Sequence, residues 1–184
     1  MKQDKKQINQ NLLLSSIKTL RNLNIDARHG LPEELFLLIS SLTPIPNVDL
    51  LITDSQNRVL LSWRDDPYAG KGWHIPGGCV RFGETMLERV HKTAVHELGC
   101  DVMVDPTPIG IQDAILPPRY QLEYPNDRGH HISILFHCSL PNNYRVNNRG
   151  KTSMDAGYLR WFEKFPSNLL PVHFGYGKIL DKWK

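Results

Sequence analysis

The stretch from Gly77 to Gly99 constrains the fold more than any other part of this chain. It opens with a double glycine, Gly77-Gly78, which allows a turn where the backbone can approach a ligand closely. Apolar residues then recur at helical spacing, and on a wheel of about 100° per residue they form one stripe: Leu87, Val90, Ala94 and Leu98. The segment therefore predicts a glycine turn followed by one amphipathic helix over residues 84–98, which Gly99 ends.

A single carboxylate lies at the edge of this stripe. Glu97 is about 80° from the centre of the stripe, and Thr93 and His96 share with it an arc of about 100°. A carboxylate in that position is partly buried, so it requires a cation or a hydrogen-bond donor. Glu97 is therefore either a metal ligand or one half of a salt bridge. Glu88 falls on the far side of the helix and is expected to be solvated, and Glu84 suits the helix dipole near the first turn.

Residues 1–45 are expected to form a helical hairpin at the N-terminus. Apolar residues recur at roughly helical spacing from about Gln7 to Leu23, and a second helix is expected from Pro32, a favoured first-turn residue, to about Leu42. The two prolines of TPIPN then end the helical pattern. We expect this appendage to pack on the rest of the chain or to build a homodimer interface, and we do not expect nucleic acid as its partner.

Residues 46–184 change to a β-rich pattern and are expected to form one domain. The runs VDLLITD and RVLLSWR, separated by Ser55-Gln56-Asn57, predict a β-hairpin. Further strands are expected in GWHIPGG, VMVDPTPIGIQDAIL, HHISILFHCSL and YLRWFEKF, and a closing helix from His173 to Trp183. Strands around one central helix, without regular alternation of strand and helix, predict an α/β sandwich with a mixed sheet.

Composition sets three limits on function. The net charge of +3 would help to hold an anionic ligand but does not by itself indicate nucleic acid. The three cysteines (Cys79, Cys100 and Cys138) show no C-x-x-C pairing, which favours free thiols in a reducing cytoplasm. No run approaches the ~20 apolar residues that a membrane span requires. A cytoplasmic protein is therefore expected.

The central segment resembles the signature of the Nudix hydrolases, G-x5-E-x7-R-E-U-x-E-E-x-G-U, in which U is aliphatic. The matching positions are Gly78, Glu84, Glu97 and Gly99, with Ala94 and Cys100 at aliphatic sites. The preceding WHIPGG is also similar to the strand that family members carry there. The resemblance covers about residues 46–165 and implies a Nudix-type α/β/α sandwich with a mixed sheet.

The departures from this signature concern the metal site. Lys92 stands for the family arginine, Thr93 for the glutamate that often acts as base, and His96 for a metal-binding glutamate. Only Glu97 remains of the three carboxylates on that arc. Because Mg²⁺ is often held by one or two carboxylates plus waters and substrate phosphates, Glu97 and the Gly77 carbonyl could hold one ion but not a cluster.

One branch of the family, GDP-mannose mannosyl hydrolase, also lacks the first two of these glutamates and attacks the sugar carbon. Asp49 and Arg64 stand where that branch has an aspartate and an arginine lining its nucleotide-sugar site, and Arg64 would suit a diphosphate. Cys79 replaces a basic residue of that branch. Asp155 replaces its metal-binding glutamine, and Ala156 its catalytic histidine. The resemblance thus makes Asp155 a possible second oxygen ligand or the base.

The residue that would deprotonate water stays open between several candidates. His130 and His131 begin a strand after a polar loop, and histidine suits general-base work near neutral pH, although a lone histidine is more often a structural hydrogen-bonding residue. Asp155 is a further candidate, as are two residues of the loop, Glu123 and Asp127.

The resemblance implies a Mg²⁺- or Mn²⁺-dependent hydrolase of a nucleoside diphosphate joined to another group, with a nucleotide sugar as the leading substrate. The roles expected of the chain are these: metal ligation by Gly77, Glu97 and Asp155, substrate binding by Asp49, Arg64, Gly78 and His130, and catalysis by Asp155, His131 and Lys92, the last as a clamp on the diphosphate. The alternative is a Nudix fold that senses a nucleotide or nucleotide sugar without turnover.

Overall fold

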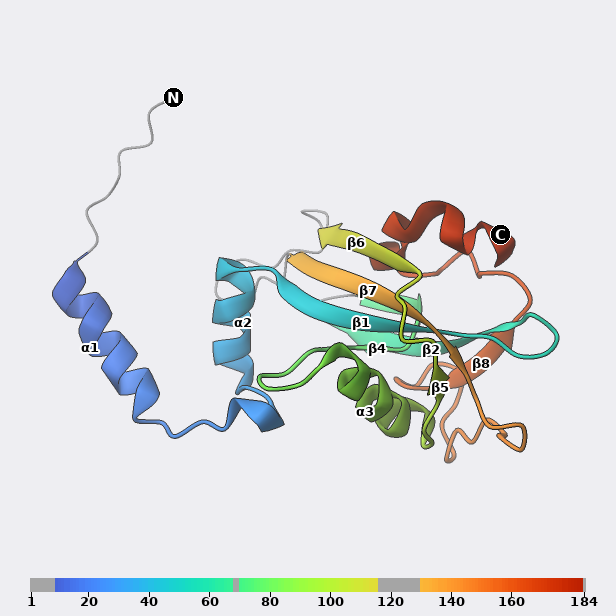
Figure 1. The fold of residues 1–184 in the computed structure, drawn as a ribbon, viewed down its shortest axis with the longest axis horizontal. Helices are drawn as coiled ribbons and strands as arrows, with labels where there is room; N and C mark the ends of the chain where they lie inside the picture. Colours follow the sequence, from blue (N-terminus) through green and yellow to red (C-terminus); the bar gives the residue numbers. More distant parts are fainter. Residues whose placement is uncertain (1–8, 68–69, 116–129, 184) are drawn as a thin grey trace, which may run out of the picture.

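The structure, a computed structural model, describes residues 9–67, 70–115 and 130–183. Its elements follow in chain order (Figure 1): α1 (Gln10–Arg21), the 3₁₀ helix η1 (Ala27–His29), α2 (Glu33–Leu42), β1 (Ile45–Ile52), β2 (Val59–Asp66), β3 (Gly70–His74), β4 (Gly77–Cys79), α3 (Met86–Leu98), β5 (Met103–Val104), β6 (Gly110–Ile115), β7 (His130–Ser139), β8 (Leu159–Phe162) and the 3₁₀ helix η3 (Pro171–Trp183).

Two sheets share the core. In the first, β1 pairs in parallel with β7 and antiparallel with β4, while β5 and β6 both pair antiparallel with β7. In the second, β2 lies between β3 and β8 in an antiparallel arrangement. The predicted mixed α/β fold is confirmed.

Alternation along β1 decides what each face of the first sheet contacts. Val48, Leu50 and Ile52 join the apolar stripe of α3 in one buried cluster, as the helical wheel predicted. Leu51 faces the other side and packs in a second cluster with residues of β2, β3 and η3. Figure 1 shows α3 and η3 on opposite sides of β1 and β7. Because successive side chains point to opposite faces of a strand, Asp49 belongs to the face that looks toward η3.

The predicted hairpin of VDLLITD and RVLLSWR is wrong in its pairing. A tight turn does reverse the chain there, because the Asp54 carboxylate accepts hydrogen bonds from the backbone of Gln56 and Arg58 and Asn57 has a positive φ of 59°. However, β1 and β2 diverge into different sheets, and only an isolated bridge joins Thr53 to Val59. The divergence lets apolar side chains from both strands fill the space between the sheets.

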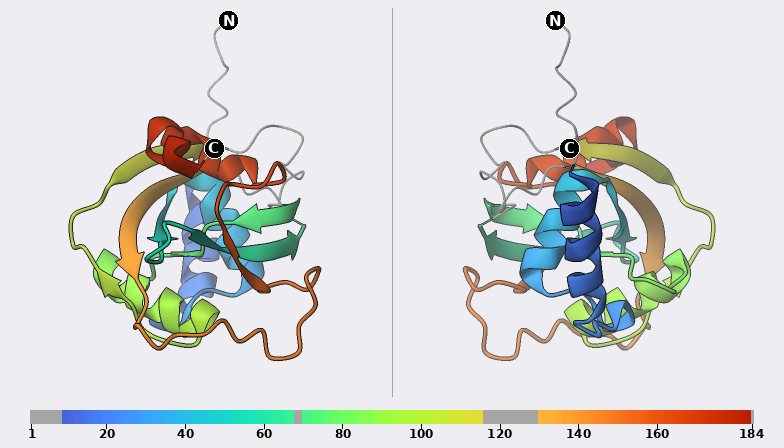
Figure 2. Two further views of the ribbon diagram at one scale, coloured as in Figure 1. Left: turned by 90° about the vertical axis from the view of Figure 1, so that its right-hand side faces the viewer. Right: turned by 90° about the vertical axis from the view of Figure 1, so that its left-hand side faces the viewer.

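The N-terminal helices lie at one end of the molecule. Figure 1 shows α1 apart from the body, with α2 between α1 and the sheets. The right-hand view of Figure 2 shows the same two helices in front of the sheets. No residue of α1 is buried, whereas Leu37 of α2 is only 4% exposed. None of the described helices combines the length and apolar character that a membrane-crossing segment requires.

Candidate functional site

Two cavities meet at the glycine turn. The smaller, of about 280 Å³, has polar walls that include Asn47, Asp49, His131, Ser133 and His173. The larger, of about 770 Å³, is bounded by α2, the loop after β4, and α3. Arg64, Gly77, Gly78 and Cys79 line both cavities. A ligand that extends past the glycine turn would therefore pass the Arg64 guanidinium.

The double glycine is needed because side chains occupy the space on both sides of β4. A Cβ added at Gly77 would collide with the Asp49 carboxylate, and one added at Gly78 would lie 2.8 Å from Thr93 Oγ1. The two glycines thus let Asp49 approach from β1 and Thr93 approach from α3. In addition, the Gly77 amide donates a hydrogen bond to Glu97 Oε1 at 3.3 Å.

Glu97 is a nearly buried carboxylate at the edge of α3. Its side chain is 17% exposed and lines the larger cavity together with Thr93 and His96, so the three residues predicted to share one arc do face the same space. Burial raises the pKa of Glu97 to about 7, against the opposing effects of Arg64 and of the Gly77 amide. Asp49 raises it further by like-charge repulsion. A carboxylate in this environment is stabilised by a cation.

Asp49 is buried among donors from η3 and its own strand. The Tyr176 hydroxyl donates to Asp49 Oδ2 at 2.6 Å, and the Asn47 amide donates to Oδ1 at 2.9 Å. Burial nevertheless raises the pKa of Asp49 to about 6. His173 Nδ1 lies 3.8 Å from Asp49 Oδ2. The carboxylate is thus held rigidly at the wall of the smaller cavity.

Two imidazole rings are oriented by the backbone of one residue, Ile75. The Ile75 amide donates to His173 Nε2 at 3.1 Å, and the Ile75 carbonyl lies 2.8 Å from His74 Nδ1. The rings stack with their centroids 6.3 Å apart. Burial lowers the pKa of His173 to about 3 and that of His74 well below its ordinary value, with Arg64 acting in the same direction. Both rings are therefore neutral at physiological pH.

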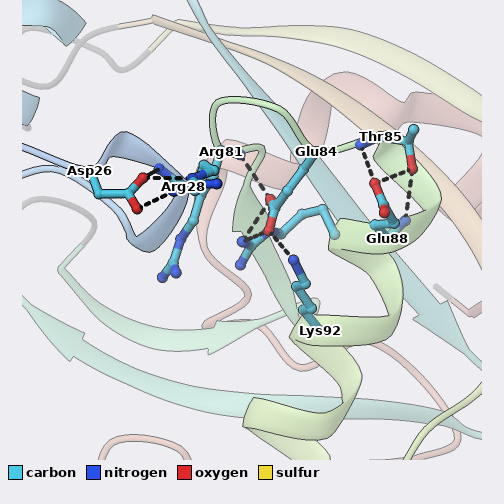
Figure 3. A network of polar contacts seen from close by, with 8 residues as sticks. Asp26, Arg28, Arg81, Glu84, Thr85, Glu88 and Lys92 are labelled. Carbon is cyan, nitrogen blue, oxygen red and sulfur yellow. Dashed lines mark hydrogen bonds and ion pairs between the residues drawn. The ribbon is translucent and has the colours of Figure 1, made fainter.

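A second carboxylate, Glu84, anchors the loop between β4 and α3 (Figure 3). It accepts hydrogen bonds from the Arg89 guanidinium at 2.6 to 2.8 Å, from Lys92 Nζ at 2.9 Å and from the Arg81 amide at 2.9 Å. These donors lower the pKa of Glu84 to about 2 despite its burial. Thr85 and Glu88 form a reciprocal capping box at the start of α3. The loop that follows the glycine turn is therefore fixed to the helix.

Comparison with known proteins identifies the family to which this fold belongs. A family model described as NUDIX domain matches residues 43–167. The chain belongs to the Nudix family. Its structure is similar to that of a MutT NUDIX hydrolase from Burkholderia pseudomallei, with 21% identity, 69% of this chain and 90% of that chain covered, and a TM-score of 0.52. It is also similar to a NUDIX-family hydrolase from Clostridium perfringens, with 16% identity, coverage of 69% and 89%, and a TM-score of 0.50.

A shorter likeness concerns a curated relative, the low-salt glycan biosynthesis protein Agl8 of Haloferax volcanii. The two sequences are 33% identical over 75 residues, which is 41% of this chain and 47% of that protein. The chain thus matches about half the length of this relative. The chain is thus a member of a family whose hydrolases act on nucleoside diphosphate-linked substrates.

The Nudix fold brings some of the expected site residues together and separates others. Asp49, Arg64, Gly78 and His131 line the smaller cavity, and Lys92 and Glu97 line the larger one. By contrast, His130 Nε2 lies 3.3 Å from the exposed Asp113 carboxylate. The residues that line the two cavities do not include His130.

Asp155 also lies outside the walls of both cavities. Its carboxylate accepts hydrogen bonds from the backbone amide and the hydroxyl of Thr152, which closes a tight turn in the exposed loop before β8. Lys92, expected as a clamp on the diphosphate, carries an ammonium that pairs with Glu84. Glu123 and Asp127 lie outside the described residues.

The N-terminal segment contributes to the site in this Nudix protein. Leu31, Phe36 and Ile39 line the larger cavity opposite Val80 and Phe82 of the loop after β4. Basic side chains, Arg81 and Arg89 among them, lie along the same cavity. This segment therefore forms an apolar wall of the cavity, beside the basic side chain of Arg81.

The donor atoms present suit one divalent ion and no cluster. Within residues 9–67, 70–115 and 130–183 there is no group of three or more His, Cys, Asp or Glu side chains placed to hold a metal. Glu97 Oε2 and His74 Nε2 lie 3.9 Å apart next to the glycine turn. An ion here would need waters and substrate phosphates to complete its coordination, as Mg²⁺ commonly does.

Three residues of the site were not expected from the sequence. His74 immediately precedes Ile75-Pro76-Gly77-Gly78, so its place at the end of the strand that leads into the glycine turn could have indicated it. His173 and Tyr176 gave no such signal, because only the packing of η3 against β6 and the first sheet brings them to Asp49.

Proposed function

We propose that this Nudix protein is a metal-dependent hydrolase of a nucleoside diphosphate linked to a sugar. The observation that carries the proposal is the nearly buried Glu97 carboxylate, which lines the larger cavity and accepts a hydrogen bond from the Gly77 amide. Gly77 and Arg64 line both cavities. A buried carboxylate next to an arginine is an arrangement that can hold a divalent ion and a diphosphate together.

The two cavities suit the two halves of such a substrate. The smaller one offers hydrogen-bonding groups from Asp49, Asn47, Ser133 and His131, which suit the hydroxyl groups of a sugar. The larger one has the apolar wall of the N-terminal segment, against which a nucleobase would pack. In this arrangement Arg64 would bind the diphosphate between the two halves through charge-assisted hydrogen bonds.

The chemistry follows from these positions. When bound, Mg²⁺ or Mn²⁺ would neutralise charge on the diphosphate and stabilise the leaving group. Glu97 would hold that ion, and the Arg64 guanidinium would orient the phosphate oxygens. His131 lines the smaller cavity and is the candidate base for the attacking water, because Asp155 lies outside both cavities. The resemblance to a glycan biosynthesis protein supports a sugar-containing substrate.

The test is a panel of GDP-, ADP- and UDP-sugars with Mg²⁺ or Mn²⁺, followed by hydrolysis in ¹⁸O-labelled water. Label in the sugar would indicate attack at carbon, and label in the nucleotide product would indicate attack at phosphorus. Glu97→Gln is expected to abolish metal-dependent turnover and to leave the fold intact. Turnover by this variant equal to that of the parent protein would remove Glu97 from the site.

A second candidate function is a sensor that binds a nucleotide sugar without turnover. It is favoured by Thr93 and His96, which place no carboxylate beside Glu97 on the arc that faces the larger cavity. Saturable binding across the panel with no hydrolysis would support it.

Two further expectations belong to the proposal. No disulfide joins Cys79, Cys100 and Cys138, and this supports a reducing cytoplasm. A homodimer through α1 stays a prediction, motivated by exposed apolar side chains such as Leu12 and Leu14, which are 63% and 61% exposed. Light scattering coupled to size exclusion would measure the mass, and Leu12→Lys/Leu14→Lys should yield a monomer.

A further inference from the structure

Among the residues that the structure describes, no hydrogen bond accounts for one ring nitrogen of His74. Its Nδ1 lies 2.8 Å from the Ile75 carbonyl oxygen, which can only accept, so Nδ1 carries the hydrogen. In the neutral ring the other nitrogen, Nε2, then has a lone pair. The side chain is 7% exposed, and His74 lines the smaller cavity.

The group that faces this lone pair is also an acceptor. Glu97 Oε2 lies 3.9 Å from His74 Nε2, and its side chain is 17% exposed. Two acceptors that face each other in a nearly buried site repel unless a cation or a donor lies between them. A shared proton does not resolve the conflict, because hydrogen bonds between such atoms span about 2.7–3.2 Å.

A metal ion fits this separation better. Bonds of about 2.1 Å from one ion to an imidazole nitrogen and to a carboxylate oxygen can bridge at most about 4.2 Å. We propose that His74 Nε2 is a second protein ligand, with Glu97, of the divalent ion in this site. The imidazole thereby compensates for the carboxylates that Thr93 and His96 do not supply.

His173 shows that the arrangement is particular to His74. The same residue, Ile75, orients it, but there the amide donates to Nε2, so the hydrogen is on Nδ1. That Nδ1–H faces Asp49 Oδ2 at 3.8 Å, which places a donor opposite an acceptor. His74 thus presents Nε2 to its neighbouring carboxylate and His173 presents Nδ1. Of these two rings, only His74 presents a lone pair to a carboxylate.

An imidazole ligand changes which metal the site prefers. Imidazole nitrogen suits Co²⁺ and Zn²⁺ better than it suits Mg²⁺, which strongly favours oxygen, and Mn²⁺ lies between them. We therefore expect Mn²⁺ and Co²⁺ to bind more tightly than Mg²⁺. This proposal shares Glu97 with the proposed function but does not require turnover, so the two can fail separately.

The test is pulsed electron paramagnetic resonance of the protein loaded with Mn²⁺, alone and with inorganic pyrophosphate. We expect coupling of the Mn²⁺ electron spin to ¹⁴N in the parent protein and none in His74→Asn. Asparagine keeps a donor for the Ile75 carbonyl but lacks the Nε2 ligand. The variant should bind Mn²⁺ at least about tenfold more weakly, with Mg²⁺ affinity changed less than about threefold.

The matched control is His96→Gln, since His96 lines the cavity that contains Glu97. The His96→Gln variant should keep the ¹⁴N coupling. If His96→Gln loses the coupling and His74→Asn retains it, the assignment of His74 as the ligand is overturned. If His74→Asn does not fold, ¹⁵N-histidine NMR of the parent protein decides: addition of Zn²⁺ should shift Nε2 of His74. An unchanged Nε2 resonance with Zn²⁺ bound would refute ligation by His74. If the protein hydrolyses its substrate but shows no nitrogen coupling to Mn²⁺, this inference is refuted and the proposed function is retained.

Discussion

Replacement of Glu84 by glutamine should destabilise the protein by about 3 kcal/mol at neutral pH. The Glu84 carboxylate is 5% exposed and pairs with Arg89, which is 10% exposed, and with Lys92, which is 59% exposed. A folded-state pKa of about 2, against an ordinary 4.5, corresponds to about 3 kcal/mol in favour of the charged carboxylate. Removing it also leaves the Arg89 guanidinium buried without its partner, a change that typically costs about 3–5 kcal/mol.

The pH dependence of this difference tests its electrostatic origin. Because the folded-state pKa is depressed, the contribution of Glu84 is complete above about pH 5 and is lost as the pH falls toward 2. Urea denaturation of the parent protein and of Glu84→Gln should therefore give free energies of unfolding that differ by about 3 kcal/mol at pH 7 and converge in acid. Near pH 7 the melting temperature should fall by roughly 6–12 °C.

Two control variants separate the buried pair from the exposed one. Lys92→Met should cost less than about 1 kcal/mol, since most of the ammonium is solvated. Glu163→Gln removes an exposed carboxylate and should leave the free energy of unfolding unchanged within about 0.5 kcal/mol. The reasoning is refuted if Lys92→Met costs as much as Glu84→Gln, or if the Glu84→Gln difference is the same at pH 7 and pH 3.

Three further predictions concern the site. Metal-free Glu97→Gln should be more stable than the parent protein at pH 8 by about 1–3 kcal/mol in urea denaturation. The reason is that the raised pKa of Glu97 makes ionisation of this carboxyl above about pH 7 unfavourable to the folded state. Equal free energies of unfolding would contradict this. Gly78→Ala should destabilise the protein by about 1–3 kcal/mol, because the new Cβ would lie 2.8 Å from Thr93 Oγ1. Adding Thr93→Ala should recover most of that loss. Additive costs of the two substitutions would show that the backbone, not this contact, requires glycine. Phe36→Ala should raise KM for a nucleotide sugar at least about fivefold with kcat nearly unchanged, whereas Leu42→Ala, an exposed position of the same helix outside the cavity, should change neither. An effect on kcat alone would place Phe36 outside the binding wall.

The part of the site that lies on α3 could be predicted from the sequence because helical periodicity is a local property. The buried stripe, the position of Glu97 at its edge and the arc shared with Thr93 and His96 all follow from spacing within one helix. The pairing of β1 and β2 was predicted wrongly for a related reason. The turn at Asp54 specifies a chain reversal, but which sheet each strand joins depends on partners distant in sequence.

The remaining part of the site depends on contacts between distant residues. Ile75 and His173 are 98 positions apart, and Tyr176 and Asp49 are 127 apart. Nothing in the local pattern of PVHFGY distinguishes a histidine that meets a buried backbone amide from one on a solvated helix. The orientation of His173 likewise arises only when η3 brings its ring to the Ile75 amide, whereas His74 contacts the carbonyl of its own neighbour.

The Tyr176–Asp49 hydrogen bond bears on how this protein can be trimmed for laboratory work. The segment that matches the family model stops at residue 167, nine positions before the tyrosine. Expressing only that segment would strip Asp49 of its shortest hydrogen bond and open the smaller cavity to water, and it would also discard the helix that carries Phe36. An inactive truncated protein would therefore say nothing about whether the full chain is an enzyme.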